Sequence, residues 1–416
     1  MTIGKKIVLM SLAIIALTLG AGFAYGISLL NFSTDAISKT FRQLDGEEEI
    51  TPIDATEPLT ILLMGVDMDQ ATRGGVWEEG RSDSMILVTV NPKTKETTMM
   101  SLTRDIMVEI AEANGESTGT VEKLNHSYSY GQAPMAIATI EKMMDINIDR
   151  YIEINMDGLV ELVDAVGGIE VNNTLGFPIS ISEYEPAYTS IVPTGKRLVN
   201  GDQALVYARM RYDDPEGDIG RQRRQREVIT AIVKKLLQLD GFTQYKKILT
   251  AISNNMRTNI EISTVTIPEL LGYKDSIKNL HSYQLRGLDE LVEEVYYQLP
   301  PTQHLLEMQN VLRTSIGLDA KTDLTTNVKV YEGQVGLPST IDVYNAYTEL
   351  LEIEADPLAE AVDIEAFTGT SASDLPEGTA SSPNLSSNSS EIEGTEMTEA
   401  TEMTEVGTET QTEEGQ

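Results

Sequence analysis

The fold of this 416-residue chain is decided by residues 83–105, which read DSMILVTVNPKTKETTMMSLTRD. Residues 85–90 and 97–102 are apolar runs of strand length, and the NPKTKE segment between them has turn chemistry, so we predict a β-hairpin. Antiparallel pairing about the centre of that turn places Asp83 opposite Arg104, because the two residues are equally far from it. A carboxylate and a guanidinium are therefore expected to meet where the hairpin opens.

The segments around this hairpin predict a layered α/β fold. Residues 59–66 form a short apolar run without alternation, as in a strand buried on both faces. Further along the chain we expect a helix over 134–145 with Pro134 in its first turn, a strand over 151–155, and a helix capped by Asp157 that runs to residue 166. Helices that alternate with strands imply α/β layers.

One consequence of this layering concerns Asp67, which follows the 59–66 strand directly. If that strand runs parallel to the strand ending at Leu102, Asp67 reaches the same edge of the sheet as Arg104. Ligands of α/β sheets tend to bind at this edge, beyond the carboxyl ends of the strands.

Composition limits the classes of function. The chain carries 31 basic and 65 acidic residues, a formal charge of −34, and 41% hydrophobic residues, which is enough for a sizeable core. Nucleic-acid binding is disfavoured, since a phosphate polyanion would meet repulsion unless positive charge were concentrated at one place. The chain has no cysteine, which excludes thiol catalysis, disulfides and iron–sulfur clusters. The histidines stand in no HExxH spacing, and no GxSxG elbow, Walker A loop or dinucleotide-binding fingerprint is present on a strand-to-helix turn.

The N-terminus predicts a membrane anchor. Lys5 and Lys6 precede an uncharged, mostly apolar stretch at residues 7–30, and about 20 such residues cross a bilayer. The following flank is acidic on balance, so residues 1–6 should be cytoplasmic and the remainder extracytoplasmic. A cleaved signal peptide is the alternative, but the stretch is long for one and ends without a convincing cleavage site. We expect a single-pass protein of the cell membrane, held in the lipid bilayer.

The remaining chain divides by composition. Residues 31–56 read as a polar stalk, 57–318 as one folded domain, and 319–368 as an appendage whose relation to the domain is left open. Residues 369–416 are rich in Ser, Thr and Glu, with 11 acidic and no basic residues. Such a segment cannot bury a core, so we expect a disordered acidic tail.

Two arginines, Arg209 and Arg211, follow a short predicted helix. Asn200 is suited to cap that helix, which should end near Ala208. An extended exit from the helix points both arginines the same way, because alternate residues of an extended chain share one side.

A longer helix is predicted from Asp218, as its cap, to about residue 240. Its apolar stripe consists of Val228, Ile232 and Leu236, and helical spacing continues that stripe through Arg221, Arg224 and Gln225. Charged residues on a core-facing stripe must face a cleft, and helix N-termini bind phosphate groups well. The alternative is a solvated loop, in which the arginines are neutralised by Asp213, Asp214, Glu216 and Asp218.

The hairpin opening has a plain alternative as well. Asp83 and Arg104 alone would be a surface ion pair of little energetic weight. Because Arg81 and Asp67 join them, two carboxylates and two guanidinium groups converge there. Asp67 and Asp83 also suit a hard cation such as Mg²⁺, which one or two carboxylates bind together with phosphate oxygens.

Taken together, these segments resemble the LytR-CpsA-Psr family of bacterial cell-envelope proteins. In the family's order they are ILLMGVD (61–67), GRSDSM (80–85), SLTRD (101–105), KLNHSY (123–128), DAVGG (164–168), GDQAL (201–205), YARMR (207–211) and GDIGRQRRQ (217–225). The resemblance implies a three-layer α/β/α domain with a mixed central sheet and an apolar pocket for a lipid chain.

The resemblance also implies an activity. It is the transfer of an anionic glycopolymer, such as a teichoic acid or capsule polymer, from a polyprenyl pyrophosphate carrier to a peptidoglycan hydroxyl as a phosphodiester. Carried over by position, the pyrophosphate ligands are Arg81, Arg104, Arg209, Arg211, Arg221 and Gln225. Asp67 and Asp83 correspond to the magnesium-associated carboxylates, and the catalytic residues are Asp83, Arg104 and Asp67. A polyprenyl pyrophosphate phosphatase and a non-enzymatic, lipid-binding envelope regulator stay open as alternatives.

Overall fold

The computed structural model describes residues 40–44, 51–68, 76–239, 242–261, 263 and 266–352. The predicted membrane anchor (7–30) and acidic tail (369–416) lie outside the described residues, as does most of the predicted stalk. Within the described ranges, no helix has both the length and the apolar character needed to span a bilayer.

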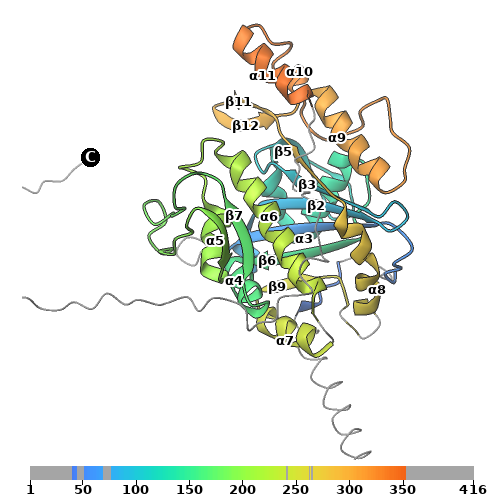
Figure 1. Cartoon of the computed structure of the whole chain (residues 1–416). Coiled ribbons are helices and arrows are strands. Elements are labelled where there is room, and N and C mark those ends of the chain that lie inside the picture. Colours follow the sequence, from blue (N-terminus) through green and yellow to red (C-terminus); the bar gives the residue numbers. More distant parts are fainter. Residues whose placement is uncertain are drawn as a thin grey trace, which may run out of the picture. The chain divides into compact units, whose positions relative to one another are not determined.

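A six-stranded mixed sheet forms the centre of the domain (Figure 1). Its strands lie in the order β10-β3-β2-β1-β6-β9. The pairs β1/β6 and β3/β10 are parallel, and the other three pairs are antiparallel. The bounds are β1 (Leu59–Asp67), β2 (Arg81–Asn91), β3 (Glu96–Leu102), β6 (Arg150–Asn155), β9 (Met256–Thr258) and β10 (Leu280–Leu285).

The predicted hairpin is confirmed as β2 and β3. Met85 pairs with Leu102 and Asn91 with Glu96, which is the register set by the centre of the turn. Because β2 is antiparallel to both β1 and β3, these two strands run parallel to each other with β2 between them. The carboxyl ends of β1 and β3 therefore meet at one edge of the sheet.

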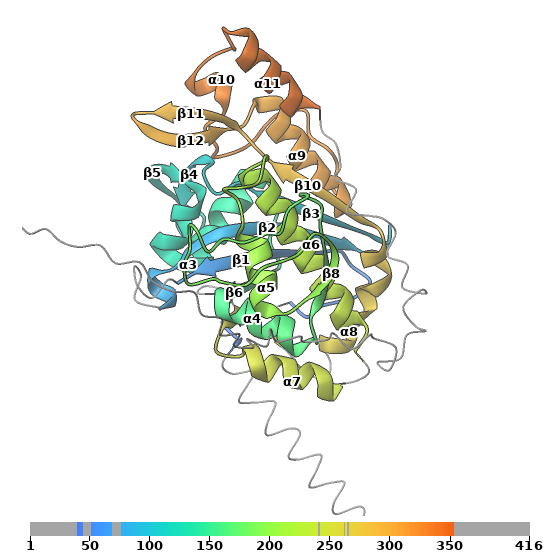
Figure 2. The ribbon, with the colours of Figure 1, turned by 60° about the vertical axis from the view of Figure 1, so that its left-hand side comes forward.

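Helices cover both faces of this sheet, which gives the predicted α/β layering (Figures 1 and 2). One face packs against α3 (Leu124–Met144) and α9 (Thr302–Ser315). The opposite face is covered by α4 (Met156–Ala165), α5 (Gly201–Arg209), α6 (Asp218–Leu237), α7 (Phe242–Ile252) and α8 (Thr266–Gly272).

The alternating side chains of β1 supply both layers. Leu62, Met64 and Val66 belong to the main core, together with side chains of α3 and α9. Ile61 and Leu63 point to the other face. An apolar residue is thus required at nearly every position, which explains why the sequence of β1 shows no period of two.

Three two-stranded antiparallel sheets and two C-terminal helices complete the domain. The sheets consist of β4 (Met107–Ala111) with β5 (Ser117–Lys123), β7 (Ile169–Asn173) with β8 (Gly195–Val199), and β11 (Leu288–Val292) with β12 (Val295–Leu299). The described part of the appendage contains α10 (Tyr331–Gln334) and α11 (Ile341–Leu351). It packs against the domain, since Val328 belongs to the main core and Tyr331 and Leu350 pack with the β11–β12 hairpin.

Two predicted helix caps are wrong. The cap of α4 is Asn155, whose side chain accepts a hydrogen bond from the amide three residues further on, rather than Asp157. Asn155 ends β6 with an extended backbone, which suits a cap position. The cap of α6 is Gly217, whose φ of 55° favours glycine. Asp218 is the first helical residue, and its carboxylate pairs with Arg221 instead of capping.

The other helices match their predictions more closely. Asn200 caps α5 in a capping box with Gln203, as its sequence predicts. The helix predicted over 134–145 is the second part of α3, and Pro134 stands in its first turn. The earlier part, which begins at Leu124, was not predicted. A break at Gly131 and Gln132 separates the two parts.

Candidate active site

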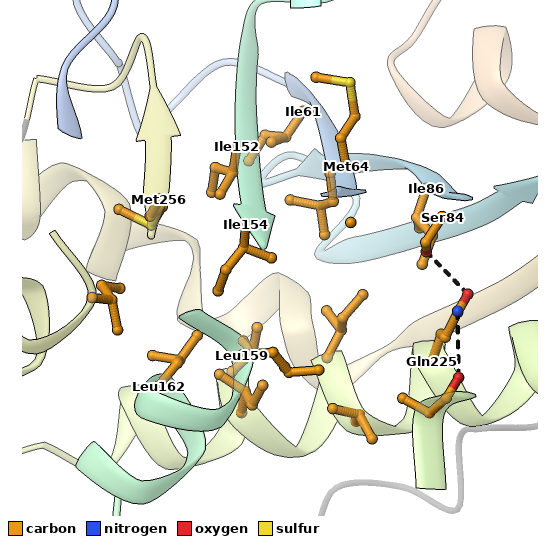
Figure 3. A pocket seen from close by; sticks show the side chains of 18 of the residues that line it. Ile61, Met64, Ser84, Ile86, Ile152, Ile154, Leu159, Leu162, Gln225 and Met256 are labelled. Atoms are coloured by element: carbon orange, nitrogen blue, oxygen red, sulfur yellow. Dashed lines mark hydrogen bonds between the residues drawn. The ribbon is translucent and has the colours of Figure 1, made fainter. Parts of the chain in front are cut away.

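A cavity of about 640 Å³ lies between the central sheet and the helices α4 to α8. Its walls are mostly apolar, with Ile61 from β1, Ile152 and Ile154 from β6, and Leu159 and Leu162 from α4 pointing into it (Figure 3). Small-molecule sites typically have volumes of about 300–1,000 Å³ and a few placed polar groups. The walls of this cavity suit an apolar ligand.

The charged lining of the cavity gathers at one edge of the sheet, with residues from the strand ends, from α5 and α6 and from the segment between these helices. Seven of the eight predicted site residues line it: Asp67, Asp83, Arg104, Arg209, Arg211, Arg221 and Gln225. Asp67 ends β1, and Arg104 follows β3, at the edge where those parallel strands terminate. The structure therefore joins apolar walls and a charged edge in one cavity.

Arg81 is the predicted site residue that does not line the cavity. Its backbone lies opposite that of Asp67 in the ladder of β1 and β2, yet Arg81 is exposed and is not among the residues that line the cavity. The register of these two strands shifts between Gly65 and Val66. This bulge allows the neighbouring residues Asp83 and Ser84 both to line the cavity, which strict alternation along a strand would forbid.

Asp83 and Arg104 form an ion pair at the hairpin opening. Arg104 Nη1 lies 3.0 Å from Asp83 Oδ1, and its Nε lies 3.5 Å from Asp105 Oδ2. Burial opposes the charge of Arg104, but the carboxylates of Asp83, Asp105 and Asp218 outweigh burial and raise its pKa. Arg104 therefore remains a cation at this edge of the cavity.

Arg209 and Arg211 line the cavity in different electrostatic settings. Arg209 Nε and Nη2 donate to Glu185 Oε2 at 2.9 and 2.5 Å, and its guanidinium stacks over Tyr188. Burial opposes the Arg209 charge, but Glu185 outweighs burial and raises the pKa. Arg211 donates to the Tyr212 hydroxyl at 2.5 Å and pairs with no carboxylate in the described part of the chain. Its positive charge is available to an anionic ligand.

Arg221 and Gln225 lie on the cavity-facing side of α6. Arg221 is only 7% exposed; burial lowers its pKa, although Asp218 Oδ1 lies 2.7 Å from its Nη2. Gln225 Oε1 accepts from Ser84 Oγ at 3.0 Å, and its Nε2 donates to Ala208 O at 3.4 Å (Figure 3). Gln225 thus links α6 to β2 and to the end of α5.

Arg223 and Arg224 of α6 pair with acidic residues of the preceding loop, as the alternative interpretation held, and the expectation that Arg224 faces the cavity is wrong, because it does not line the cavity. Arg223 forms an exposed pair with Glu216. Arg224 is buried, where it pairs with Asp214 and donates its Nε to Tyr207 O at 2.9 Å. The two interpretations of this segment therefore apply to different residues, since Arg221 faces the cavity and its neighbours hold the loop before α6.

Three polar residues at the cavity edge were not predicted as site residues. Glu185 and Ser84 line the cavity, and Asn125 Nδ2 donates to Asp83 Oδ1 at 3.4 Å. Glu185 lies in the irregular segment between β7 and β8, where no periodicity points to it. The sequence points to Ser84 as a site residue only weakly, through its position beside Asp83 at the hairpin opening.

The donor set at the sheet edge fits a divalent cation held partly by its substrate. Asp67 and Asp83 line one cavity, and Asn125 Oδ1 is buried with no protein partner among the described residues. The described residues contain no group of three or more acidic, His or Cys side chains that could hold a metal by themselves. Mg²⁺ is commonly bound by one or two carboxylates plus substrate phosphates, which is the mode these residues allow.

Comparison with known proteins shows which family the chain belongs to. Residues 27–314 match the model of the LytR_cpsA_psr family. The chain belongs to that family. Biofilm regulatory protein A of Streptococcus mutans is 50% identical over 82% of this chain and 84% of its own length. The Enterococcus faecalis polyisoprenyl-teichoic acid–peptidoglycan teichoic acid transferase TagU is 38% identical, over 76% of this chain and 99% of its own.

A solved structure of a family relative has the same fold. The crystal structure of protein gbs0355 from Streptococcus agalactiae superposes with a TM-score of 0.65 at 49% identity. The match covers 72% of this chain and all of that one (100%). The mixed central sheet and its helical layers are therefore those of the LytR_cpsA_psr domain.

Proposed function

We propose that this protein transfers an anionic glycopolymer from a polyprenyl pyrophosphate carrier to a hydroxyl of peptidoglycan, leaving a phosphodiester. One observation carries the proposal. A single cavity joins apolar walls suited to a prenyl chain with an edge that holds four guanidinium groups, in a chain of charge −34. The name of the transferase relative describes the same class of reaction.

The arginines supply most of the chemistry. Charge on the phosphoryl oxygens is stabilised by cations that the fold has already placed, and attacking and leaving oxygens must stay in line. Arg211 contributes a guanidinium without a carboxylate partner among the described residues. Arg104 and Arg221 bring charges that already interact with carboxylates of the protein. An incoming pyrophosphate gives buried Arg221 a stronger anionic partner, which offsets the cost of burying its charge.

The reaction is a displacement at phosphorus. A sugar hydroxyl of peptidoglycan forms a P–O bond with the phosphorus nearer the polymer. The P–O–P bond breaks, and polyprenyl phosphate leaves with the electron pair. The hydroxyl proton passes to Asp83 or Asp67, both of which line the cavity beside the arginines. Asp67 and Asp83 would also hold Mg²⁺, which when bound adds positive charge at the phosphate oxygens.

The proposal includes a location. Residues 7–30 anchor the chain in the cell membrane with its N-terminus in the cytoplasm, so that the domain lies outside. A polyprenyl carrier is itself a membrane lipid, and the anchor keeps the cavity near it. Peptidoglycan, the acceptor, is then on the same side of the membrane as the domain.

The test uses the purified full-length protein with a labelled polyprenyl pyrophosphate-linked glycan and peptidoglycan as acceptor. The proposal expects label in peptidoglycan with the unmodified protein and loss of this product with Arg104→Ala or Arg211→Ala. Normal transfer by both variants would contradict it. Release of free phosphorylated glycan without labelled peptidoglycan would indicate a phosphatase, and tight lipid binding without either product would indicate a regulator.

A further inference from the structure

A pair of tyrosines stands outside the cavity, next to its charged edge. The rings of Tyr184 and Tyr212 are 4.5 Å apart, centre to centre, with 33° between their planes. Tyr184 is 47% exposed and Tyr212 is 56% exposed, so about half of each residue faces solvent. Two stacked rings that stay half exposed offer an aromatic face to a ligand.

This pair is joined to the cavity edge by its chain neighbours. Tyr184 precedes Glu185, and Tyr212 follows Arg211; both of these neighbours line the cavity. The Arg211 guanidinium lies 4.5 Å from the centre of the Tyr212 ring. Two separate loops, one between β7 and β8 and one between α5 and α6, thus bring two aromatic rings to the guanidinium that has no carboxylate partner in the described structure.

We infer that Tyr184 and Tyr212 form a subsite for a pyranose ring of the substrate, beside the anion-binding arginines. The inference rests on the proposed function and deepens it. A sugar ring presents a face of polarised C–H groups that packs on the electron-rich face of an aromatic ring. In the donor, the first sugar is bonded directly to the phosphate, so a group that grips this phosphate must have the sugar beside it. In the acceptor, the attacking hydroxyl is itself part of a sugar.

The nearby polar groups suit a sugar as well. Asp213 Oδ1 lies 3.5 Å from the Tyr184 hydroxyl, and the exposed Asp213 carboxylate raises the pKa of that tyrosine. Aromatic faces with exposed hydroxyl and carboxylate groups at their rim can recognise both the C–H and the O–H groups of a pyranose. A lipid pyrophosphate without a sugar has no pyranose ring and no sugar hydroxyls to meet these groups.

Binding measurements on the full-length protein test the subsite separately from turnover. Dissociation constants are measured by calorimetry for farnesyl pyrophosphate, for farnesyl pyrophosphoryl-N-acetylglucosamine, and for a soluble N-acetylglucosamine–N-acetylmuramic acid disaccharide. The variants are Tyr184→Leu, which removes the aromatic face, and Tyr184→Phe, which keeps it. Tyr344→Leu, on α11 and 53% exposed, is the matched control.

The subsite predicts that Tyr184→Leu weakens a sugar-bearing ligand about 3- to 10-fold, as expected for loss of one aromatic contact. Farnesyl pyrophosphate binding should change less than twofold, and Tyr184→Phe should retain most of the sugar-dependent affinity. A loss confined to the donor assigns the rings to the carrier's first sugar, and a loss confined to the disaccharide assigns them to the acceptor. Equal effects with and without sugar, or no effect on any ligand, would overturn the inference. Failure of the unmodified protein to bind farnesyl pyrophosphate would instead contradict the proposed function, while the disaccharide would still report on the rings.

Discussion

Arg221 and Val228 lie on the same side of α6, two turns apart, and both line the cavity. One helix therefore supplies a cation at the charged edge and an apolar side chain further along the wall. A ligand that satisfies both residues needs an anionic head attached to an apolar chain.

Replacing Arg221 by methionine separates binding from stability. Arg221→Met keeps the buried stem and removes a charge whose burial lowers its pKa. We expect affinity for farnesyl pyrophosphate to fall about 10- to 100-fold, the loss of one charge-assisted contact, without a lower melting temperature. The control is Arg223→Met, which removes an exposed arginine of the same helix. A variant with unchanged affinity and reduced stability would show that Arg221 is structural.

Filling the apolar wall tests where the prenyl chain lies. Ile154 of β6 points into the cavity (Figure 3), so Ile154→Trp should occupy space that the chain needs. We expect affinity for farnesyl pyrophosphate to fall at least about tenfold, while inorganic pyrophosphate binds within about twofold of the unmodified protein. Leu337→Trp, at a position 77% exposed, provides the control. Equal affinity of Ile154→Trp for the lipid would place the chain elsewhere.

Removal of divalent cations tests the two carboxylates. Transfer should be lost after treatment with a chelator and return when Mg²⁺ is added. Asp67→Asn should raise the Mg²⁺ concentration needed for half-maximal transfer, because one anionic ligand is gone. Glu349→Gln, at an exposed position of α11, removes a carboxylate outside the cavity and should not change this concentration. Full transfer in the presence of chelator would show that the reaction needs no divalent cation.

Glu153 should make stability depend on pH. It is 2% exposed, and burial raises its pKa to about 7 from 4.5. The folded state then keeps a proton that the unfolded state releases between those two pH values, so the free energy of unfolding falls as pH rises through the window. Glutamine has no such proton to lose. We therefore expect the free energy of unfolding of Glu153→Gln to rise by on the order of 1–3 kcal/mol relative to that of the unmodified protein as the pH goes from 5 to 8. Denaturant unfolding at both pH values measures this, and parallel changes in the two proteins would contradict it.

Gly220 should be intolerant of any side chain. A Cβ there would lie 2.0 Å from Asp214 Oδ2, the carboxylate that pairs with buried Arg224. We expect Gly220→Ala to lower the free energy of unfolding by about 2–4 kcal/mol, because the buried pair must separate. At Gly333 the nearest atom to a new Cβ is 3.6 Å away, so Gly333→Ala should stay within about 1 kcal/mol of the unmodified protein. Similar free energies of unfolding for the two variants would show that the loop before α6 can move to make room for the new side chain.

The sequence predicted those parts of the site that follow from local spacing. The Asp83–Arg104 pair depends only on the centre of one turn, and the places of Arg221 and Gln225 depend on the period of one helix. Both rules act over short distances along the chain, so the amino-acid sequence is enough to predict these positions.

Other features depend on contacts between distant segments. Arg81 was placed with the site beside Asp83, but the bulge of β2 at Asp83, opposite Gly65 and Val66, changes which residues face the cavity. Glu185 reaches Arg209 from a loop without periodicity. The parallel pairing of β10 with β3 joins segments far apart in sequence and has no local signal. Tertiary packing decides such features.

The most direct test of the account is a crystal structure of the protein with farnesyl methylenediphosphonate, an analogue of the lipid head and chain in which a P–CH₂–P bridge replaces the P–O–P bond that breaks. The account predicts phosphate oxygens within hydrogen-bond distance of Arg104, Arg211 and Arg221, with the prenyl chain running past Ile154 and Val228. An analogue bound at any other surface, with these three arginines untouched, would contradict it.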